Sequence, residues 1–211
     1  MMTFHPGHPT TPTPPAPPPA PASAPAWRAV ERRLEVFTAD PRTELTDMAT
    51  RLSRLRELDI HLHDHEDLDT LADTMSERAG FRYAMVNAFG EEQTFIGLRN
   101  PPRDAGYPLV GRTMSRAHGY CPEVVQRRLG LPLPNVAASP RYASNHVCDA
   151  IGIQSYFGEP VIDAATGLVL ATVCVIDTEP RTLDDARRLQ AIVKDGARAA
   201  ADLLHIPTPL P

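Results

Sequence analysis

The sequence predicts an α+β fold in which helices pack on an antiparallel β-sheet. Two pairs of apolar segments, rich in β-branched and aromatic residues, are each joined by a short loop containing glycine, which is typical of β-hairpins. Segments with a helical spacing of apolar residues come before the first hairpin and after the second. The strand expected at 168–177 (LVLATVCVID) is apolar at nearly every position, so we expect it to be central and covered on both faces.

Composition divides the 211 residues into a tail and a domain. Residues 6–25 are nearly all Pro, Ala, Thr and Ser, and such a segment has no apolar face to bury. We therefore predict a disordered tail at 1–26, a short helix and linker at 27–43, a folded domain at 44–206 and a tail at 207–211.

Charge and hydropathy limit the partners and the compartment. The net charge of −5 comes without a cluster of Lys and Arg, which argues against nucleic acid as a partner. No apolar run is long enough to span a membrane, and the N-terminal segment lacks the pattern of a signal peptide. The three cysteines include no CxxC pair, which fits a reducing compartment. These features predict a cytoplasmic protein that contacts neither membrane nor nucleic acid.

The first half of the domain is predicted as two helices and a hairpin. A helical stripe runs through 44–59, and its apolar members are Leu45, Met48, Leu52, Leu55 and Leu58. A second helix is expected at 67–79, with Gly80 as its C-terminal cap. Residues 81–89 and 93–98 then form the first hairpin.

The second half is predicted as a long irregular connection, a hairpin and a helix. Within the connection we expect a short helix at 122–129, and an edge strand at 131–136 because its two prolines bar a central position. The second hairpin joins 153–162 to 168–177, and Thr182 caps a helix that runs to about Leu204. Long connections in compact domains are commonly functional, so we expect a site between 99 and 154.

Five segments in order resemble the GAF domain family of small-ligand sensors. They are RLSRLRELDI with HEDLDTLADTMSERAGF (51–81), SRAHGYCPEVV (115–125), NVAASPRYASN (135–145), GIQSYFGEPVID (152–163) and TGLVLATVCVIDTEPRTL (166–183). The chain departs from the family pattern at Asn135, Gln154 and Ala171. The resemblance implies a sheet of about six antiparallel strands flanked by helices, with a pocket on one face under the long connection.

The resemblance also implies a sensory function, with a small molecule of unknown identity as ligand and an output through a partner or a dimer. A pocket needs apolar walls and a few polar groups. The predicted ligand-binding residues are Met114, Tyr120, Cys121, Tyr142, His146 and Tyr156. Arg112, Ser115, Arg116 and His118 form a second polar group that either meets an anionic ligand or satisfies loop carbonyls. We predict no metal site and leave any cofactor open.

Two other functions stay open. NHVCDA (145–150) resembles a segment of free methionine-R-sulfoxide reductases, which are enzymes built on a GAF domain, with Cys148 and Cys121 as the thiols. Ser155 and Val175 stand where that family carries carboxylates, so we predict that the protein is not an enzyme. The third hypothesis is a pure interaction protein that makes its contact through the Pro-rich tail.

The alternating histidines His61, His63 and His65 suggest either a metal site or a solvated loop, and we favour the loop.

The apolar stripes of 44–59 and of the last helix predict a homodimer through a four-helix bundle. The alternative, nearly as strong, is that both stripes pack on the chain's own sheet.

Overall fold

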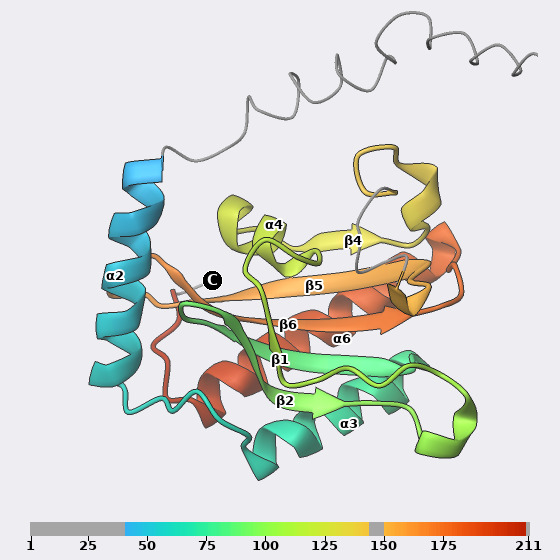
Figure 1. The fold of residues 1–211 in the computed structure, drawn as a ribbon, viewed down its shortest axis with the longest axis horizontal. Helices are drawn as coiled ribbons and strands as arrows, with labels where there is room; N and C mark the ends of the chain where they lie inside the picture. The colour runs from blue at the N-terminus through green and yellow to red at the C-terminus, as the bar shows by residue number, and fades with distance from the viewer. Residues whose placement is uncertain (1–40, 144–149, 210–211) are drawn as a thin grey trace, which may run out of the picture. The chain divides into compact units, whose positions relative to one another are not determined.

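A six-stranded antiparallel sheet forms the centre of the domain (Figure 1). The computed structural model describes residues 41–143 and 150–209. The order across the sheet is β3-β2-β1-β6-β5-β4. The strands are β1 (Tyr83–Phe89), β2 (Gln93–Arg99), β3 (Thr113–Met114), β4 (Leu131–Leu133), β5 (Ser155–Ile162) and β6 (Val169–Asp177). The central strands β1 and β6 are buried at every residue, which confirms the prediction for the second hairpin.

Helices and loops cover the two faces of the sheet differently. The helices are α2 (Pro41–Glu57), α3 (Glu66–Ala79), α4 (Cys121–Arg127) and α6 (Leu183–Leu203). Two short 3-10 turns lie at Arg103–Ala105 and Val136–Ala138. The long helices α3 and α6 pack on one face, whereas α4 and the connecting loops cover the other (Figure 1).

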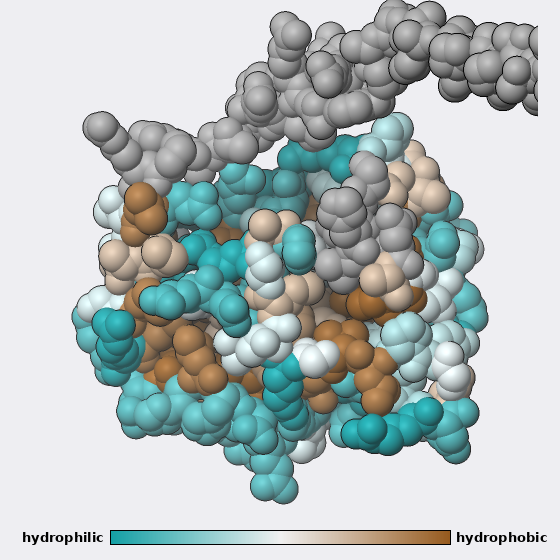
Figure 2. All heavy atoms as spheres, in the orientation of Figure 1, coloured by the Kyte–Doolittle hydropathy of each residue, from teal (hydrophilic) through white to brown (hydrophobic). Residues whose placement is uncertain are grey.

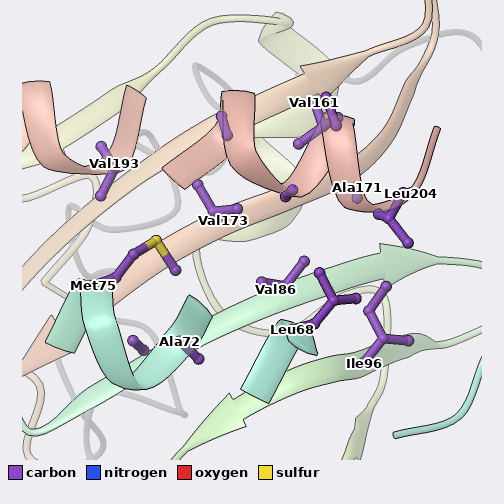
Figure 3. Packing of buried hydrophobic residues seen from close by; sticks show 14 of the residues in the cluster. Leu68, Ala72, Met75, Val86, Ile96, Val161, Ala171, Val173, Val193 and Leu204 are labelled. Carbon is purple, nitrogen blue, oxygen red and sulfur yellow. The ribbon is translucent and has the colours of Figure 1, made fainter. Parts of the chain in front are cut away.

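The helix-covered face holds the larger apolar core. Figure 3 shows Met75 of α3, Val86 of β1, Val173 of β6 and Val193 of α6 directed into the same space. Gly97 of β2 lets α3 lie close to the sheet, because a Cβ at this position would be 2.4 Å from the carbonyl oxygen of Leu68.

The apolar stripe of α6 is buried within the single chain. Its buried residues are Leu189, Ile192, Val193, Gly196, Ala197, Ala200 and Ala201. Burial of the α6 stripe on the chain's own sheet is the alternative to dimer pairing that the sequence left open. On α2, by contrast, Leu45 remains exposed. The homodimer therefore stays a prediction, with Leu45 of α2 and Leu183 and Leu203 of α6 as exposed apolar residues.

Helix α2 lies at the end of the strands, beside the hairpin loops (Figure 1). Arg54 contacts both carboxylate oxygens of the buried Asp163, at 3.1 and 3.3 Å, and so ties α2 to the β5–β6 loop. The Nε of Arg51 donates to the carbonyl oxygen of Val169 at 2.7 Å. These two arginines fix α2 against the first residues of β6.

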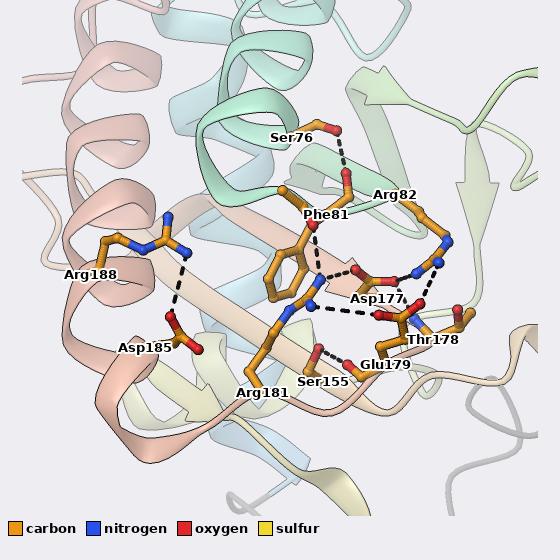
Figure 4. A network of polar contacts seen from close by, with 11 residues as sticks. Ser76, Phe81, Arg82, Ser155, Asp177, Thr178, Glu179, Arg181, Asp185 and Arg188 are labelled. Atoms are coloured by element: carbon orange, nitrogen blue, oxygen red, sulfur yellow. Dashed lines mark hydrogen bonds and ion pairs between the residues drawn. The ribbon is translucent and has the colours of Figure 1, made fainter.

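A charged network closes the opposite end of β6 (Figure 4). The buried carboxylate of Asp177 accepts from both Arg82 and Arg181, and Arg82 also contacts Glu179 at 2.6 Å. The guanidinium of Arg181 lies 4.6 Å from the centroid of the Phe81 ring. The network joins the start of β1 to the segment before α6, so its role is structural.

Most predicted elements are confirmed within a few residues. Gly80 ends α3 in the left-handed conformation, with φ of 68°, and the Thr182 hydroxyl accepts from the backbone of Asp185 at the start of α6. The predicted edge strand is β4, shortened to three residues. Strand β3 is a correction, because 99–115 was expected to be irregular throughout; its two residues carry too short a pattern to be recognised.

Two predictions concern the N-terminal residues. The tail at 1–26 and the helix expected after Trp27 lie outside the described residues. Among the residues described, no helix combines the length and the apolar content needed to cross a membrane.

Candidate functional site on the loop-covered face

The loop-covered face contains a buried polar cluster within an apolar surrounding. Asn87 of β1 and Thr172 of β6 are register partners, and both are fully buried. Neither Asn87 Oδ1 nor Thr172 Oγ1 has a hydrogen-bond partner among the described residues. More than nine in ten buried polar groups in proteins are paired, so two unpaired oxygens side by side require an explanation.

Gln93 ties this cluster to the loop above it. The Nδ2 of Asn87 donates to Gln93 Oε1 at 2.8 Å. The Nε2 of Gln93 donates to the carbonyl oxygens of Ser115 and His118, at 2.7 and 2.8 Å. The segment after β3 is thereby held over the sheet, and Gln93 is fully buried without an unpaired atom of its own.

Two free thiols lie beside the polar oxygens. Cys121 is the first residue of α4, and its Sγ is 3.8 Å from the Sγ of Cys174 in β6. Hydrogen bonding by Cys174 lowers the pKa of the Cys121 thiol and outweighs burial, which opposes it. The hydroxyl of Tyr156 lowers this pKa further.

Tyr156 closes the cluster from the side of β5. Its hydroxyl is 3.4 Å from Cys121 Sγ. A Cβ at Gly158 would be 2.1 Å from this hydroxyl, so the ring lies along the sheet surface over Gly158. Burial raises the pKa of Tyr156 well above its usual value, which keeps the hydroxyl neutral. The glycine thus makes room for a ring that covers the site.

An aromatic series leads from Tyr156 toward the outside. The Tyr120 ring lies 5.1 Å from the Tyr156 ring and 6.0 Å from the Tyr142 ring, measured between centroids. The Tyr120 hydroxyl also donates to the carbonyl oxygen of Tyr142 at 2.9 Å. A displacement of Tyr156 would therefore be felt by the segment that carries Tyr142.

The structure brings most of the predicted ligand-binding residues into one cluster. Tyr120, Cys121 and Tyr156 are buried in it, and Met114 and Tyr142 pack against it half-buried. His146 lies outside the described residues. Whether these residues bind a ligand stays a prediction.

Sequence reasoning missed Asn87, Gln93 and Thr172. The available signal was a polar residue within an otherwise apolar strand, as in YAMVNAF. The register of β1 against β2 also shifts between Val86 and Asn87, and such irregularities are common beside functional sites.

The residues of the second predicted polar group, around Arg112 and Arg116, have different partners in the structure. Arg112 pairs with Asp69 of α3, with Nη2 and Oδ2 2.6 Å apart, and is not directed at the cluster. The Ser115 hydroxyl accepts from the backbone of Ala117 at 3.3 Å. Of the four residues of this group, only Arg116 has a buried side-chain nitrogen, Nε, without a partner among the described residues.

The positions considered for metal binding and thiol chemistry have other surroundings. The rings of His61 and His63 stack at 5.5 Å, and the described ranges contain no group of three His, Cys, Asp or Glu placed to hold a metal ion. Ser155 donates to the carbonyl oxygen of Glu179 at 2.7 Å, and Val175 is buried on the helix-covered face. Cys148 lies in the part of the chain that is not described.

Fold and site together define a small α+β domain with one helix-covered sheet face and one loop-covered face that holds a polar cluster. The GAF domain family model matches residues 65–200, and the chain belongs to this family. The recognition and the fold class predicted from the sequence are thereby confirmed.

Solved structures of GAF domains are similar at low sequence identity. The GAF domain of a phosphoenolpyruvate-protein phosphotransferase from Coxiella burnetii is 13% identical, with a TM-score of 0.49 over 76% of this chain and 94% of that one. The blue-light absorbing PixJ GAF domain of Thermosynechococcus elongatus is 10% identical, with a TM-score of 0.48 over 73% of this chain and 89% of that one.

The free methionine-R-sulfoxide reductase of Neisseria meningitidis is 15% identical, with a TM-score of 0.47 over 78% of this chain and 96% of that one. At these values nothing about the ligand or the chemistry of this chain follows from the similarity. A comparison with curated protein sequences gave no match.

Proposed function

We propose that this GAF domain is a sensory or regulatory module that binds a small molecule between the sheet and α4. The observation that carries the proposal is the pair of buried, unpaired oxygens of Asn87 and Thr172. Leaving a buried polar atom unpaired costs about 1–3 kcal/mol. A ligand that donates N–H or O–H groups to both oxygens would recover this cost, so the site favours a polar molecule with adjacent donors.

Binding on this face requires Tyr156 to move, since its ring occupies the space over Gly158. The same ring contacts Tyr120, and its hydroxyl contacts Cys121 at the start of α4. Displacement of Tyr156 would therefore shift α4 and the segment around Tyr142. This movement is the signal we propose to be passed to a partner protein or to a second copy of the chain.

The proposed role is that of a cytoplasmic binding protein and not of an enzyme. The three cysteines without a CxxC pair support a reducing compartment. The thiol-enzyme alternative depends on Cys148 and predicts reduction of free methionine sulfoxide that is lost in Cys148→Ser. The interaction alternative predicts that a protein lacking residues 1–26 no longer captures its partner.

A thermal-shift screen with a metabolite library tests the binding proposal, because a ligand of the folded state raises the melting temperature. Compounds that raise it are then titrated against Thr172→Val, with Thr182→Val at the start of α6 as the control. Loss of the Thr172 hydroxyl should weaken binding by about tenfold, the equivalent of one hydrogen bond. A library without any active compound, or compounds that bind Thr172→Val as tightly as the wild type, would contradict the proposal.

A further inference from the structure

Arg51 of α2 is a buried cation with an unsatisfied donor. The residue is only 4% exposed. Its Nε donates to the Val169 carbonyl oxygen, but its Nη1 is buried without a hydrogen-bond partner among the described residues. Burial lowers the pKa of the guanidinium, because a low-dielectric surrounding disfavours the charged form. Buried charges in proteins are normally paired, whereas the carboxylates Asp47 and Glu44 raise the pKa of Arg51 less than burial lowers it.

Arg116 brings a second cation to the same place from the loop after β3. Its Nη1 lies 2.8 Å from the Met48 sulfur, and its Nη2 lies 3.4 Å from Glu44 Oε1. Its Nε is buried and unpaired among the described residues. The charge of Arg116 also lowers the pKa of Arg51, so the two guanidinium groups repel one another. The two positive charges are therefore close together, and each guanidinium group has one N–H donor without a partner among the described residues.

The neighbouring carboxylates do not balance these cations. Glu44 is 60% exposed at its side chain, and its contact with Arg116 is long. Asp47 lies 3.6 Å from Arg128, a third arginine near Arg51. Ion pairs of this exposed kind contribute little free energy. The three arginines therefore exceed the two carboxylates by one positive charge.

The position of Arg116 is fixed by the fold. Gln93 holds the backbone on both sides of it, at Ser115 and His118. Arg51 is fixed by its bond to β6. Figure 2 shows a mostly hydrophilic surface between α2 and α4. Two rigidly held guanidinium groups with free N–H donors match the oxygens of a carboxylate or phosphate.

We propose that Arg51 and Arg116 bind the carboxylate or phosphate group of a small molecule. A water molecule would satisfy the two donors but would leave the repulsion between the cations, whereas an oxyanion removes both costs. This oxyanion site uses atoms other than those of the Asn87 and Thr172 cluster. It therefore goes beyond the function proposed above and holds or fails separately from it.

Inorganic phosphate, acetate and chloride, compared at equal ionic strength on the full chain, test the oxyanion site. Phosphate or acetate should raise the melting temperature of the wild type more than chloride does, and calorimetric titration should give a saturable isotherm. A response to phosphate alone assigns a phosphate group, and a response to acetate alone assigns a carboxylate. Arg51→Met and Arg116→Met should each weaken binding by at least tenfold.

Arg198→Met on α6 is the matched control. This side chain is 73% exposed, and its removal changes the net charge by the same amount. It should leave oxyanion binding unchanged. Arg116→Met keeps the test decisive if Arg51→Met fails to fold, since Arg116 does not anchor α2 to β6. Equal effects of all three salts, or an oxyanion effect that persists in Arg116→Met, would overturn the proposal.

Discussion

Thr172→Val should make the protein more stable, although it removes a polar group from the candidate site. The hydroxyl is fully buried and has no hydrogen-bond partner among the described residues, so no such bond is lost. Valine has nearly the same shape, so the packing around this position is retained. An unpaired buried hydroxyl costs about 1–3 kcal/mol, and we expect about 1 kcal/mol of this to be recovered as free energy of unfolding. For a domain of this size the melting temperature should rise by about 2–4 °C.

Thr182→Val provides the opposite case in the same chain. The Thr182 hydroxyl accepts from the Asp185 backbone at the start of α6, and loss of such a cap costs about 1 kcal/mol. Urea unfolding followed by circular dichroism gives both free energies. The reasoning is refuted if Thr172→Val is destabilised as much as Thr182→Val, because the Thr172 hydroxyl would then have a partner.

Two further predictions concern packing and pH. Gly97→Ala should destabilise the fold by about 3 kcal/mol, because the new Cβ would lie 2.4 Å from a backbone oxygen of Leu68. Gly111→Ala, with nothing within 4 Å of the new Cβ, should change stability by less than about 0.5 kcal/mol. Equal urea midpoints for Gly97→Ala and Gly111→Ala would contradict this difference. Burial raises the pKa of Asp163, but hydrogen bonds from its loop and from Arg54 outweigh it and hold the pKa below its usual value. The carboxylate therefore stabilises the fold above pH ~4, and this contribution is lost as the pH falls further. Wild type should lose more stability than Asp163→Asn between pH 5 and pH 3, and parallel curves would show that the pKa is not depressed.

The sequence by itself determined the fold class and most of the elements. The nine residues of β6 are buried because nearly all of them are apolar, so a central strand was the arrangement open to them. Gly80 and Thr182 marked helix ends through local chemistry that does not depend on the rest of the fold. The two-residue strand β3 escaped prediction because a pattern of period two needs more residues to be visible.

Only the tertiary structure decided which polar groups meet and which remain unpaired. Cys121 and Cys174 are 53 residues apart in sequence, and their contact depends on α4 packing over β6. Arg112 and Arg116 looked alike as members of one loop, yet Asp69 of α3 neutralises the first. The second contacts Met48 and Glu44 of a different helix, α2, which no local pattern indicates. Patterns of apolar residues report local geometry, whereas the pairing of charges depends on distances between elements, and these are set by packing of the whole core.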